Sequence, residues 1–548
     1  MNYYDKHKDV LATAVAAIYQ RKYWSPYPES PRAYAEDADA KAKEAFAKQM
    51  NQNFDGLTAS TNWVGEEVSP FLQTGIGVKY PQHSVDELLA NATKAQQSWG
   101  STSVETRAGL LTESLERIKG RFFDIAYATM HCTGQANMMS FQASGPHAND
   151  RALEAVAMGL QQQTIFPAEV EWVKPMGKFD LKLRKNYKSV PKGVGLVIGC
   201  STFPVWNTVP GVYANLICGN VTLVKPHPKA VLPIAIVIAE LQKLLTEAGL
   251  DPNTVQLAVD TSDAPITKQL AENKAIKLVD FTGSNAFGDY VESLPKTTFT
   301  EKAGVNCALI DSVADMKAVA GNLAFSACLY SGQMCTAPQT IFIAETGVKT
   351  SQGHFSYDEV VVSISEAFTG LVNNPKMGAN ILGALQSDVT LNRLQNAKNL
   401  GGKVLLDTAL VKNEEFENSR THSPVLLEVS ASDEQIYGQE CFGPVTFIVK
   451  TSNIEQSLEI MQELAVSKGA LTCSCWCTDA DKCSEIETQM NAAFVPVSFN
   501  FGGAAFVNSH AAFSDLHVTG GNPAGNASFT NADYITKRFV WVGNRYGI

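Results

Sequence analysis

Apolar and polar residues alternate along the chain in blocks that predict strands separated by helices. Residues 193–199, GVGLVIG, and residues 221–228, VTLVKPHP, are short apolar runs typical of buried strands. Residues 232–250, LPIAIVIAELQKLLTEAGL, have the length and spacing of a helix that stops at Gly249. The runs TVQLAV and AIKLVDFTGS continue the series. Strands that alternate with helices predict a parallel α/β sheet.

A second series of the same kind begins after residue 335 and predicts a second α/β domain. Its members are IFIAETG, VVVSISEAFTGLV, GGKVLLDTAL, PVTFIVKTSNIEQSLEIMQELA and GALTCSCWCTD. A chain of 548 residues is too long for one compact unit, so we expect two or three domains.

The first 60 residues differ from the rest of the chain. They are polar and alanine-rich, and the prolines of YWSPYPESPRAYAE break any helix there, so we expect an extension. After Ser84, the runs VDELLANATKAQQSW and TRAGLLTESLERIKGRFFDIA place apolar residues at helical spacing. This pattern predicts two helices.

Two further segments are typical of β-structure. Residues 171–191 hold a Pro-Met-Gly turn, after which Phe179, Leu181 and Leu183 alternate with charged residues, and this pattern predicts a strand pair with one wet face. The tail, residues 530–548, contains RFVWVG, a short apolar strand. We expect this strand to pair outside its own domain, and residues 171–191 are a candidate partner.

Charge and composition narrow the classes of function. Lys and Arg number 44 and Asp and Glu 55, and the net charge of −11 disfavours nucleic acid or an anionic membrane as the main partner. A small molecule is the expected ligand. No signal peptide is recognisable and no segment approaches ~18 continuous apolar residues, so we expect a cytoplasmic protein. The 11 cysteines are odd in number and scattered, which indicates reduced thiols.

Cys335, in SGQMCTAP, is the candidate nucleophile, because a thiolate attacks carbonyl carbon readily. Taken alone, a free cysteine is more often a packing residue. Glu301, in TEKAGVN, and Glu440, in QECFGPV, are surface glutamates when each is taken singly. The three thiols of CSCWC, residues 473–477, share one face of a strand and have no CxxC pair or histidine at ligand spacing, so we expect no metal site.

Other motifs lie where the ligands of parallel sheets bind. In FTGS, Gly283 allows close backbone approach and Ser284 is placed to cap a helix whose free N–H groups can seat a pyrophosphate. An ordinary strand-to-helix turn also explains this motif and is favoured when it is taken alone. Lys225 and His227 follow a strand at its carboxyl end.

In their order along the chain, these motifs resemble the signature set of the aldehyde dehydrogenase family. They are KP at 225–226, FTGS at 281–284, TEKAG around Glu301 as a variant of ELGGK, GQ-x-C at 332–335 and E-x-FGPV at 440–445. Glu301 and Cys335 are 34 positions apart (335 minus 301), which is the family spacing. The resemblance covers residues 60–548. YWSPYPESP and IGCSTFPVWNTVPG resemble the phenylacetate-degradation branch, a type of ring-opening aldehyde dehydrogenase.

The resemblance implies a Rossmann-type coenzyme-binding domain, a second α/β catalytic domain and a small β element for oligomerisation. The implied boundaries are 1–60 for the N-terminal extension, 61–170 and 192–302 for the coenzyme domain, 303–510 for the catalytic domain, and 171–191 with 525–548 for strands that bridge subunits. A homodimer or homotetramer is therefore expected.

The resemblance also implies catalytic roles. Cys335 attacks an aldehyde, Glu301 is the general base for the water that hydrolyses the thioester, and Thr202 stands where the family places an oxyanion-binding asparagine. Loss of one oxyanion donor can cost about 10²- to 10³-fold in rate, so the hydroxyl or a bound water substitutes, or the activity is weak. Asn207 is the less favoured substitute, because we expect it to lie in the following helix.

The same resemblance implies a nicotinamide cofactor. Lys225 corresponds to the ligand of the adenosine ribose, Glu440 to the ligand of the nicotinamide ribose, and Phe442 to the residue that packs against the cofactor. NAD-preferring members often carry a glutamate three positions after the lysine, where this chain has Pro228. Without that carboxylate, Lys225 and His227 can pair with a 2′-phosphate. NADP is therefore favoured over NAD.

Several functions stay open at this point. Glu301 favours oxidation of an aldehyde to the free acid, because a base is needed chiefly for hydrolysis. The alternatives are a CoA-acylating dehydrogenase or acyl-CoA reductase, and a weakly active or non-catalytic member of the fold, for which Thr202 gives support. A cysteine hydrolase needs a histidine beside Cys335, and none of the nine histidines falls in a recognisable partner motif. The branch resemblance implies a semialdehyde from an opened phenylacetate ring, with or without an attached CoA.

Overall fold

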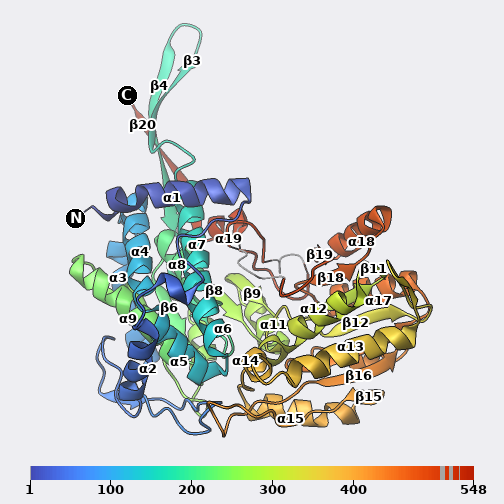
Figure 1. Ribbon diagram of the computed structural model, residues 1–548. Coiled ribbons are helices and arrows are strands. Elements are labelled where there is room, and N and C mark those ends of the chain that lie inside the picture. The colour runs from blue at the N-terminus through green and yellow to red at the C-terminus, as the bar shows by residue number, and fades with distance from the viewer. Residues whose placement is uncertain (1, 507–511, 518–521, 530) are drawn as a thin grey trace.

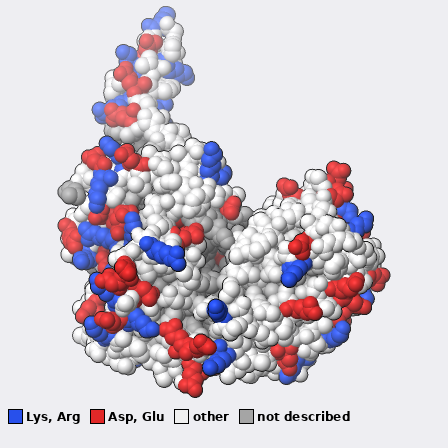
Figure 2. Space-filling model, viewed as in Figure 1, with Lys and Arg blue, Asp and Glu red and all other residues white. Residues whose placement is uncertain are grey.

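The computed structural model describes residues 2–506, 512–517, 522–529 and 531–548, and it consists of two α/β lobes and a projecting β-ribbon (Figure 1). The blue to green part of the chain builds the first lobe, and the yellow to red part builds most of the second. Figure 2 shows a hollow between the two lobes. Acidic and basic side chains are interspersed over the rest of this face, so neither sign of charge dominates it.

Five parallel strands form the sheet of the first lobe, in the order β7–β6–β5–β8–β9. Their bounds are β5 Val194–Ile198, β6 Thr222–Lys225, β7 Val255–Leu257, β8 Ile276–Thr282 and β9 Thr297–Glu301. The predicted parallel α/β sheet is confirmed. The strand order reverses beside β5, because β6 lies on one side of it and β8 on the other. Ligands of such sheets bind outside the carboxyl ends of the strands at this reversal.

Helices cover both faces of this sheet (Figure 1). Those that come after the first two are α3 Val85–Trp99, α4 Val104–Lys119, α5 Phe122–Thr133, α6 Asn137–Gln142, α7 Ala148–Gln163, α8 Val209–Ile217, α9 Leu232–Glu247, α10 Thr267–Glu272 and α11 Asn285–Ser293. The run TRAGLLTESLERIKGRFFDIA, expected as one helix, is divided between α4 and α5. The break falls at Gly120 and Arg121, where glycine is a poor helix former. Among the described residues, no helix has the length and apolarity needed to cross a membrane.

The residues expected as an N-terminal extension belong to the core of the first lobe. They form α1, Tyr3–Gln20, and α2, Ala38–Gln49, and α1 packs against α4 and α7. The apolar face of α1 is buried, with Leu11 1% exposed and Ala14 fully enclosed. Gly109 of α4 permits this contact, since a Cβ there would lie 2.3 Å from the backbone nitrogen of Tyr4. The first helix is therefore an integral layer of this lobe.

A seven-stranded sheet forms the second lobe, in the order β15–β16–β17–β12–β10–β18–β19. The strands are β10 Cys307–Ile310, β12 Thr340–Ala344, β15 Lys403–Leu406, β16 Val425–Ser430, β17 Val445–Thr451, β18 Cys473–Trp476 and β19 Val497–Phe499. All neighbours are parallel except β15 and β16. The second α/β domain expected from the sequence is confirmed.

Both faces of the second sheet are apolar because successive side chains of a strand point to opposite sides. Along β10, Cys307 and Leu309 pack into one core, and Ala308 and Ile310 into the other. The covering helices are α12 Met316–Cys328, α13 Tyr357–Val372, α14 Gly378–Leu382, α15 Asp388–Asn396, α16 Glu434–Tyr437, α17 Ile454–Lys468 and α18 Ala480–Ala492. Smaller elements are the pair β1 Asn62–Val64 and β2 Tyr80–Gln82, and the sheet of β11 Ser312–Val313, β13 Val348–Thr350 and β14 Gly353–Phe355.

The projecting ribbon consists of three antiparallel strands (Figure 1). They are β3 Glu169–Pro175, β4 Asp180–Pro191 and β20 Phe539–Gly547, and β20 pairs with β4 along its whole length. The pairing predicted for RFVWVG is confirmed. Helix α19, Ala532–Thr536, leads into β20 and packs on α7 and α8 of the first lobe.

Candidate active site

Several residues singled out in the sequence lie at the carboxyl edge of the first sheet. Lys225 is the last residue of β6 and Glu301 the last residue of β9. Gly283 and Ser284 follow β8 directly, and the segment 199–208 follows β5. The carboxyl ends of parallel strands meet at one edge of a sheet, and this geometry gathers the side chains.

Cys335 reaches this edge from the second lobe, on the turn that follows α12. Three consecutive residues there have left-handed backbone, with φ of 51° at Tyr330, 52° at Ser331 and 61° at Gly332. Non-glycine residues rarely adopt this conformation, so the surroundings must hold it. The Tyr330 hydroxyl donates to the carbonyl of Thr133 at 2.6 Å, and Ser331 Oγ donates to the carbonyl of Leu382 at 2.9 Å. Both contacts fix the turn that presents the thiol.

Cys335, Glu301 and His517 form a compact cluster. The Cys335 Sγ, a carboxylate oxygen of Glu301 and a ring nitrogen of His517 all lie within 4.8 Å of one another. His517 Nε2 is 3.1 Å from Glu301 Oε2, and Asn207 Nδ2 donates to the same oxygen at 3.4 Å. The other oxygen, Oε1, is buried and has no hydrogen-bond partner in the described part of the chain. One carboxylate oxygen is therefore held while the other is left for chemistry.

The sequence analysis identifies Cys335 and Glu301 as candidate site residues but does not identify His517. This histidine comes 216 positions after Glu301 (517 minus 301), on a segment without apolar periodicity or a recognisable motif. Its ring packs against Trp206, with ring centroids 5.2 Å apart, and against Phe529, at 5.4 Å, and its side chain is 3% exposed. A histidine in contact with two aromatic rings keeps its position through packing as well as through its polar contacts.

The electrostatics of the cluster keep the carboxylate charged and the thiol neutral at rest. Burial raises the pKa of Glu301, but the charge of His517 and the hydrogen bonds from His517 and Cys335 outweigh it, so the net shift is downward. Burial raises the pKa of the Cys335 thiol well above its usual range, and the charge of Glu301 adds to that rise. The thiol must therefore lose its proton to a neighbouring base before or during its reaction.

A cavity of about 550 Å³ extends to Cys335. Much of its wall is apolar, and the larger apolar side chains include Met139, Phe203, Trp206, Phe325, Met334 and Ile381. Three charged or titratable side chains, Glu29, His147 and Lys376, also line it. Glu29 Oε1 lies 3.1 Å from His147 Nε2. Residues 1–60 therefore contribute to the wall of the cavity.

The segment 199–208 supplies an asparagine to the cavity, but not from position 202. The Thr202 hydroxyl lies 4.0 Å from Cys200 Sγ, and Thr202 is not among the described residues that line the cavity. Asn207 does line it, together with Cys335. The expectation that Asn207 lies in a helix is wrong, because α8 begins at Val209. Asn207 belongs to the turn before α8, which leaves its amide free to face the cluster.

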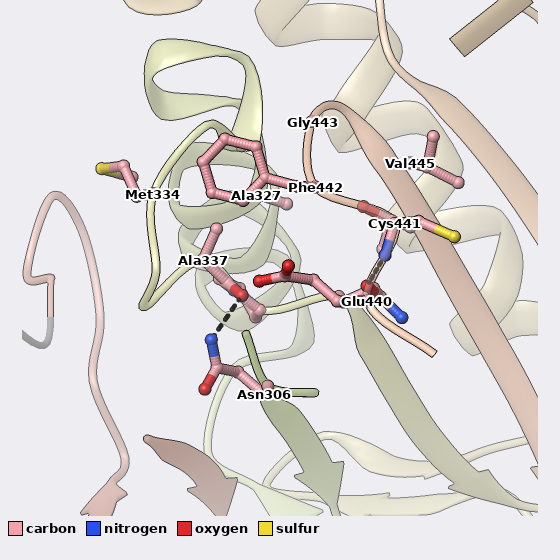
Figure 3. A pocket seen from close by; sticks show the side chains of 14 residues that line it. Asn306, Ala327, Met334, Ala337, Glu440, Cys441, Phe442, Gly443 and Val445 are labelled. Carbon is pink, nitrogen blue, oxygen red and sulfur yellow. Dashed lines mark hydrogen bonds between the residues drawn. The ribbon is translucent and has the colours of Figure 1, made fainter. Parts of the chain in front are cut away.

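Glu440 and Phe442 face a small pocket next to the Cys335 turn (Figure 3). Figure 3 shows both side chains and the Asn306 amide on the same pocket, and Asn306 Nδ2 donates to the carbonyl of Cys335 at 2.7 Å. Gln339 holds the 439–441 backbone by donating to the Gln439 carbonyl at 2.9 Å. Burial raises the pKa of Glu440 to about 7. This carboxyl group therefore changes charge near neutral pH.

Lys225 and His227 lie together at the end of β6 but do not form a free cationic site. Lys225 Nζ is 2.6 Å from Asp260 Oδ1, and both side chains are almost fully buried. Burial lowers the pKa of Lys225, although Asp260 opposes this shift. Burial also lowers the pKa of His227 to about 4, with a further contribution from Lys225. At neutral pH the imidazole of His227 is uncharged and the charge of Lys225 is already paired.

Ser284 occupies the N-cap position of α11, as the sequence predicts, with extended backbone. Its side chain makes no capping hydrogen bond. The N–H groups of the first turn of α11 are therefore not capped by Ser284, which suits an anionic ligand at this end of the helix. Gly283 lies directly before it, where a Cβ would come 2.8 Å from the Phe281 ring. Lys225, Ser284 and Glu440 are the residues that could hold a dinucleotide at this edge of the sheet.

The fold and the site together define an oxidoreductase. Its nucleotide-binding sheet lies in the first lobe, and Cys335 faces this sheet from the second lobe. The model of the aldehyde dehydrogenase family matches residues 66–513. The chain belongs to this family, and it is an NAD(P)-dependent aldehyde dehydrogenase.

Related proteins agree with this assignment. A crystal structure of an NAD-dependent aldehyde dehydrogenase from Burkholderia multivorans is 42% identical, covers 100% of this chain and 99% of its own, and superposes with a TM-score of 0.97. A 1-pyrroline-5-carboxylate dehydrogenase of Oceanobacillus iheyensis is 24% identical over 92% of this chain and 96% of its own. The benzaldehyde dehydrogenase [NAD(+)] of Pseudomonas putida is 23% identical over 88% of this chain and 96% of its own.

Proposed function

We propose that the chain oxidises an apolar aldehyde to the free carboxylic acid through a thioester on Cys335. The observation that carries this proposal is the cluster of Cys335, Glu301 and His517, whose reactive atoms lie within 4.8 Å of one another beside an apolar cavity. The Cys335 thiol lies at the end of the cavity and also next to a base, Glu301. This arrangement supports acyl chemistry rather than a packing role.

The first step is attack of the Cys335 sulfur on the aldehyde carbon. The S–H proton leaves to Glu301 as the S–C bond forms, and the carbonyl electron pair moves onto oxygen. The raised pKa of the thiol, caused first by burial, makes a base at this step necessary. A bound nicotinamide dinucleotide supplies the acceptor for the hydride that the adduct releases. Loss of that hydride leaves the acyl group on Cys335.

The oxyanion of the adduct needs hydrogen-bond donors, and we assign Asn207 as one of them. Its Nδ2 lies on the cavity wall beside Cys335 and is 3.4 Å from Glu301. Thr202, the residue at the family position, faces Cys200. The Asn207 amide, on the turn before α8, thus takes the role of the asparagine that is absent at position 202. Preorganised donors of this kind are worth about 10²- to 10³-fold in rate.

Hydrolysis of the thioester is the second half of the reaction. Glu301 must first pass the thiol proton to solvent. Its Oε1, buried without a hydrogen-bond partner among the described residues, can then take a proton from a water that attacks the acyl carbon. This base favours water over CoA as the acyl acceptor. His517 does not redirect the site toward cysteine-hydrolase chemistry, because its ring nitrogen contacts Glu301 Oε2 at 3.1 Å.

The cavity wall indicates the class of substrate. Its aromatic and methionine side chains suit an aromatic or long aliphatic aldehyde, and about 550 Å³ is enough for a chain of that size. Lys376 adds a cationic group that can pair with a distant acidic group of the substrate. A semialdehyde from an opened phenylacetate ring, with or without CoA, has both features and is our specific candidate.

For the cofactor we propose NAD in preference to NADP. The preference for NADP expected from Pro228 requires cations at Lys225 and His227. Lys225 is paired with Asp260 at 2.6 Å, and the pKa of His227 is lowered to about 4 by burial. A 2′-phosphate placed here would meet the Asp260 carboxylate, to which Lys225 is already paired. Ribose hydroxyls, by contrast, can donate to that carboxylate.

The test is the appearance of reduced nicotinamide when purified protein meets a panel of aliphatic, aromatic and ring-opened aldehydes. NAD and NADP are run in parallel, each with and without CoA. We expect turnover without CoA, highest with apolar aldehydes and with NAD. A strict requirement for CoA would overturn the hydrolytic route, and a preference for NADP would overturn the assignment of the ribose site.

We also propose that the β-ribbon joins this chain to a second copy. The ribbon exposes apolar side chains in water, with Phe179, in the turn between β3 and β4, 63% exposed, Val540 51% and Val173 45%. Exposed apolar surface on a projecting ribbon favours burial against a partner. Size-exclusion chromatography with light scattering should give a dimer or tetramer, and Phe179→Asp should shift the population toward monomer. A monomeric wild type would contradict this proposal.

A further inference from the structure

The cluster contains one group whose role the proposed reaction leaves unassigned, the imidazole of His517. It lies outside residues 66–513, the region matched by the family model. Its Nε2 is 3.1 Å from Glu301 Oε2, and its side chain is 3% exposed. A buried, potentially charged ring against a buried carboxylate is costly unless the two groups compensate each other. The contact between His517 and Glu301 therefore indicates a functional role for His517.

We propose that His517 is a positioning residue whose imidazole holds Glu301 ionised and turned so that Oε1 is the atom that takes protons. This inference rests on the proposed function, because it concerns the base of that reaction. His517 and Asn207 both contact Oε2, at 3.1 and 3.4 Å. Oε1 has no hydrogen-bond partner among the described residues. Two contacts on one oxygen leave the other to take a proton from water.

The groups around the Glu301 carboxylate determine its charge. Burial alone raises the pKa of Glu301 and would leave it protonated and useless as a base near neutral pH. The charge of His517 and its hydrogen bond lower the pKa again, with help from Cys335. The groups that raise the pKa of Cys335 beyond the effect of burial are acids or thiols, namely Glu301, Cys200 and Glu440. Among these neighbours, His517 is the group able to carry a positive charge.

Other charged groups near the cluster are already paired. Arg538 lies 2.6 Å from Asp280, and Arg151 lies 3.0 Å from Glu154. Among the described residues, the other titratable groups that interact with Glu301, besides Cys335, are Cys200, Glu440 and the hydroxyl of Tyr534, and burial raises the pKa of each. Because the charges within these ion pairs compensate each other, His517 is the described residue that can compensate the charge of Glu301.

The fold holds His517 in a fixed position, as expected of a residue that positions another side chain. The Trp206 and Phe529 rings pack against it, and the segment before it is tied to α7. The backbone N–H of Phe513 donates to Glu154 Oε2 at 2.6 Å, and Arg151 Nη1 donates to the carbonyl of Asp515 at 3.4 Å. A ring held in this way has little freedom to leave the carboxylate.

The test isolates the hydrolytic step and needs no cofactor. The probe is p-nitrophenyl acetate, which transfers its acetyl group to a thiol and releases p-nitrophenol. Intact-mass spectrometry follows formation and loss of the acetyl-enzyme, and peptide mapping assigns the acetyl group to Cys335. The rate of acetyl loss is measured from pH 5 to pH 9.5 in wild type and in His517→Gln.

We expect His517→Gln to keep a polar side chain beside Oε2 but to remove the group that can carry a positive charge. Without that group, the effect of burial on Glu301 dominates, and Glu301 is protonated up to a higher pH. Acetyl loss should therefore fall about 10²-fold at pH 7, the size of a lost general base, and should recover toward the wild-type rate at pH 9. A purely structural role would lower the rate equally at every pH. His517→Asn, a smaller amide, is the second variant should His517→Gln not fold.

His131→Gln is the matched control, because His131 is also a buried histidine stacked on an aromatic ring, Phe46. Burial lowers the pKa of His131 to about 4, so its loss removes no charge above pH 5. Its pH profile should match wild type. Identical profiles for wild type and the His517 variants would overturn the inference. An acetyl-enzyme that never hydrolyses in wild type would instead overturn the proposed hydrolytic function.

Discussion

Two cysteine-bearing regions of the second lobe differ in what surrounds the thiols. Cys473 and Cys475, from CSCWC, lie on β18 between β10 and β19 and are fully enclosed among apolar side chains. Cys335 follows the left-handed turn of residues 330–332 and lies at the end of a cavity, next to Glu301 and His517. Burial raises the pKa of Cys475 as it does that of Cys335. A low pKa is therefore not what distinguishes the nucleophile.

The difference lies in access and in the neighbouring base. An enclosed thiol on a central strand has neither a path for substrate nor a group to take its proton, whereas Cys335 has both. Reactive cysteines are commonly recognised by an electropositive setting that lowers the pKa. In this site the thiol is neutral at rest, and the base must act during the reaction.

Cys335→Ala should have the largest effect. Removal of the nucleophile should lower aldehyde oxidation by about 10⁴-fold or more, because no other group can form the thioester. Binding of NAD, followed by tryptophan fluorescence, should stay unchanged. Substantial turnover in this variant would erase the distinction between Cys335 and the strand thiols.

Glu301→Gln should come next, with steady-state oxidation about 10²- to 10³-fold lower. The amide can take a proton neither from the Cys335 thiol nor from water, so both halves of the reaction should slow. Rapid-mixing experiments should show a slow first turnover without a burst of reduced nicotinamide. A normal burst followed by a stall would mean that Glu301 acts only on the water and that another base takes the thiol proton.

Asn207→Ala should lower the rate about 10²-fold by removal of an oxyanion donor. Thr202→Ala is the matched comparison and should change the rate little, since its hydroxyl faces Cys200. Steady-state kcat/KM of the two variants measures the contrast. The reverse ranking would return the oxyanion role to Thr202.

The pH dependence of cofactor affinity should reveal Glu440. Burial raises its pKa to about 7, so it is protonated below and ionised above that pH. A carboxylate accepts hydrogen bonds from ribose hydroxyls better than a carboxylic acid does. The Kd for NAD, measured by isothermal titration calorimetry, should therefore rise as pH falls from 8 to 6. The same titration of Glu440→Gln should lose this dependence.

Cys475→Ser should have the smallest effect on activity. A hydroxyl in the enclosed core finds no ready partner, so the free energy of unfolding should fall by about 1–3 kcal/mol. Denaturant unfolding measures this loss, and kcat should stay at the wild-type value. A large loss of activity in the folded variant would show that the strand thiols affect the site.

Sequence patterns can predict the scaffold of the site because parallel strands deliver their last residues to one edge. Lys225, Gly283 and Glu301 are identified in this way. Asn207 is misplaced although a signal is present: Pro210 lies at the second position of α8, where proline is typical of a helix start. A residue three positions earlier therefore precedes the helix.

The rest cannot be predicted because it depends on tertiary packing. His517 reaches Glu301 through aromatic contacts and through α7, neither of which leaves a periodic trace in the sequence. The N-terminal helices escape prediction because the proline-rich residues between them suggest an irregular segment. Asn2 is the available signal, since its side chain accepts from the backbone N–H groups of Tyr4 and Asp5 and caps α1.

The position of two residues relative to the shared family region has an evolutionary consequence. Glu29 and His517 lie outside residues 66–513, yet one lines the cavity and the other touches the base. Terminal segments diverge more freely than the sheets they cover. A substitution at either position would thus alter the cavity wall or the surroundings of the base while the region shared with the family stays unchanged.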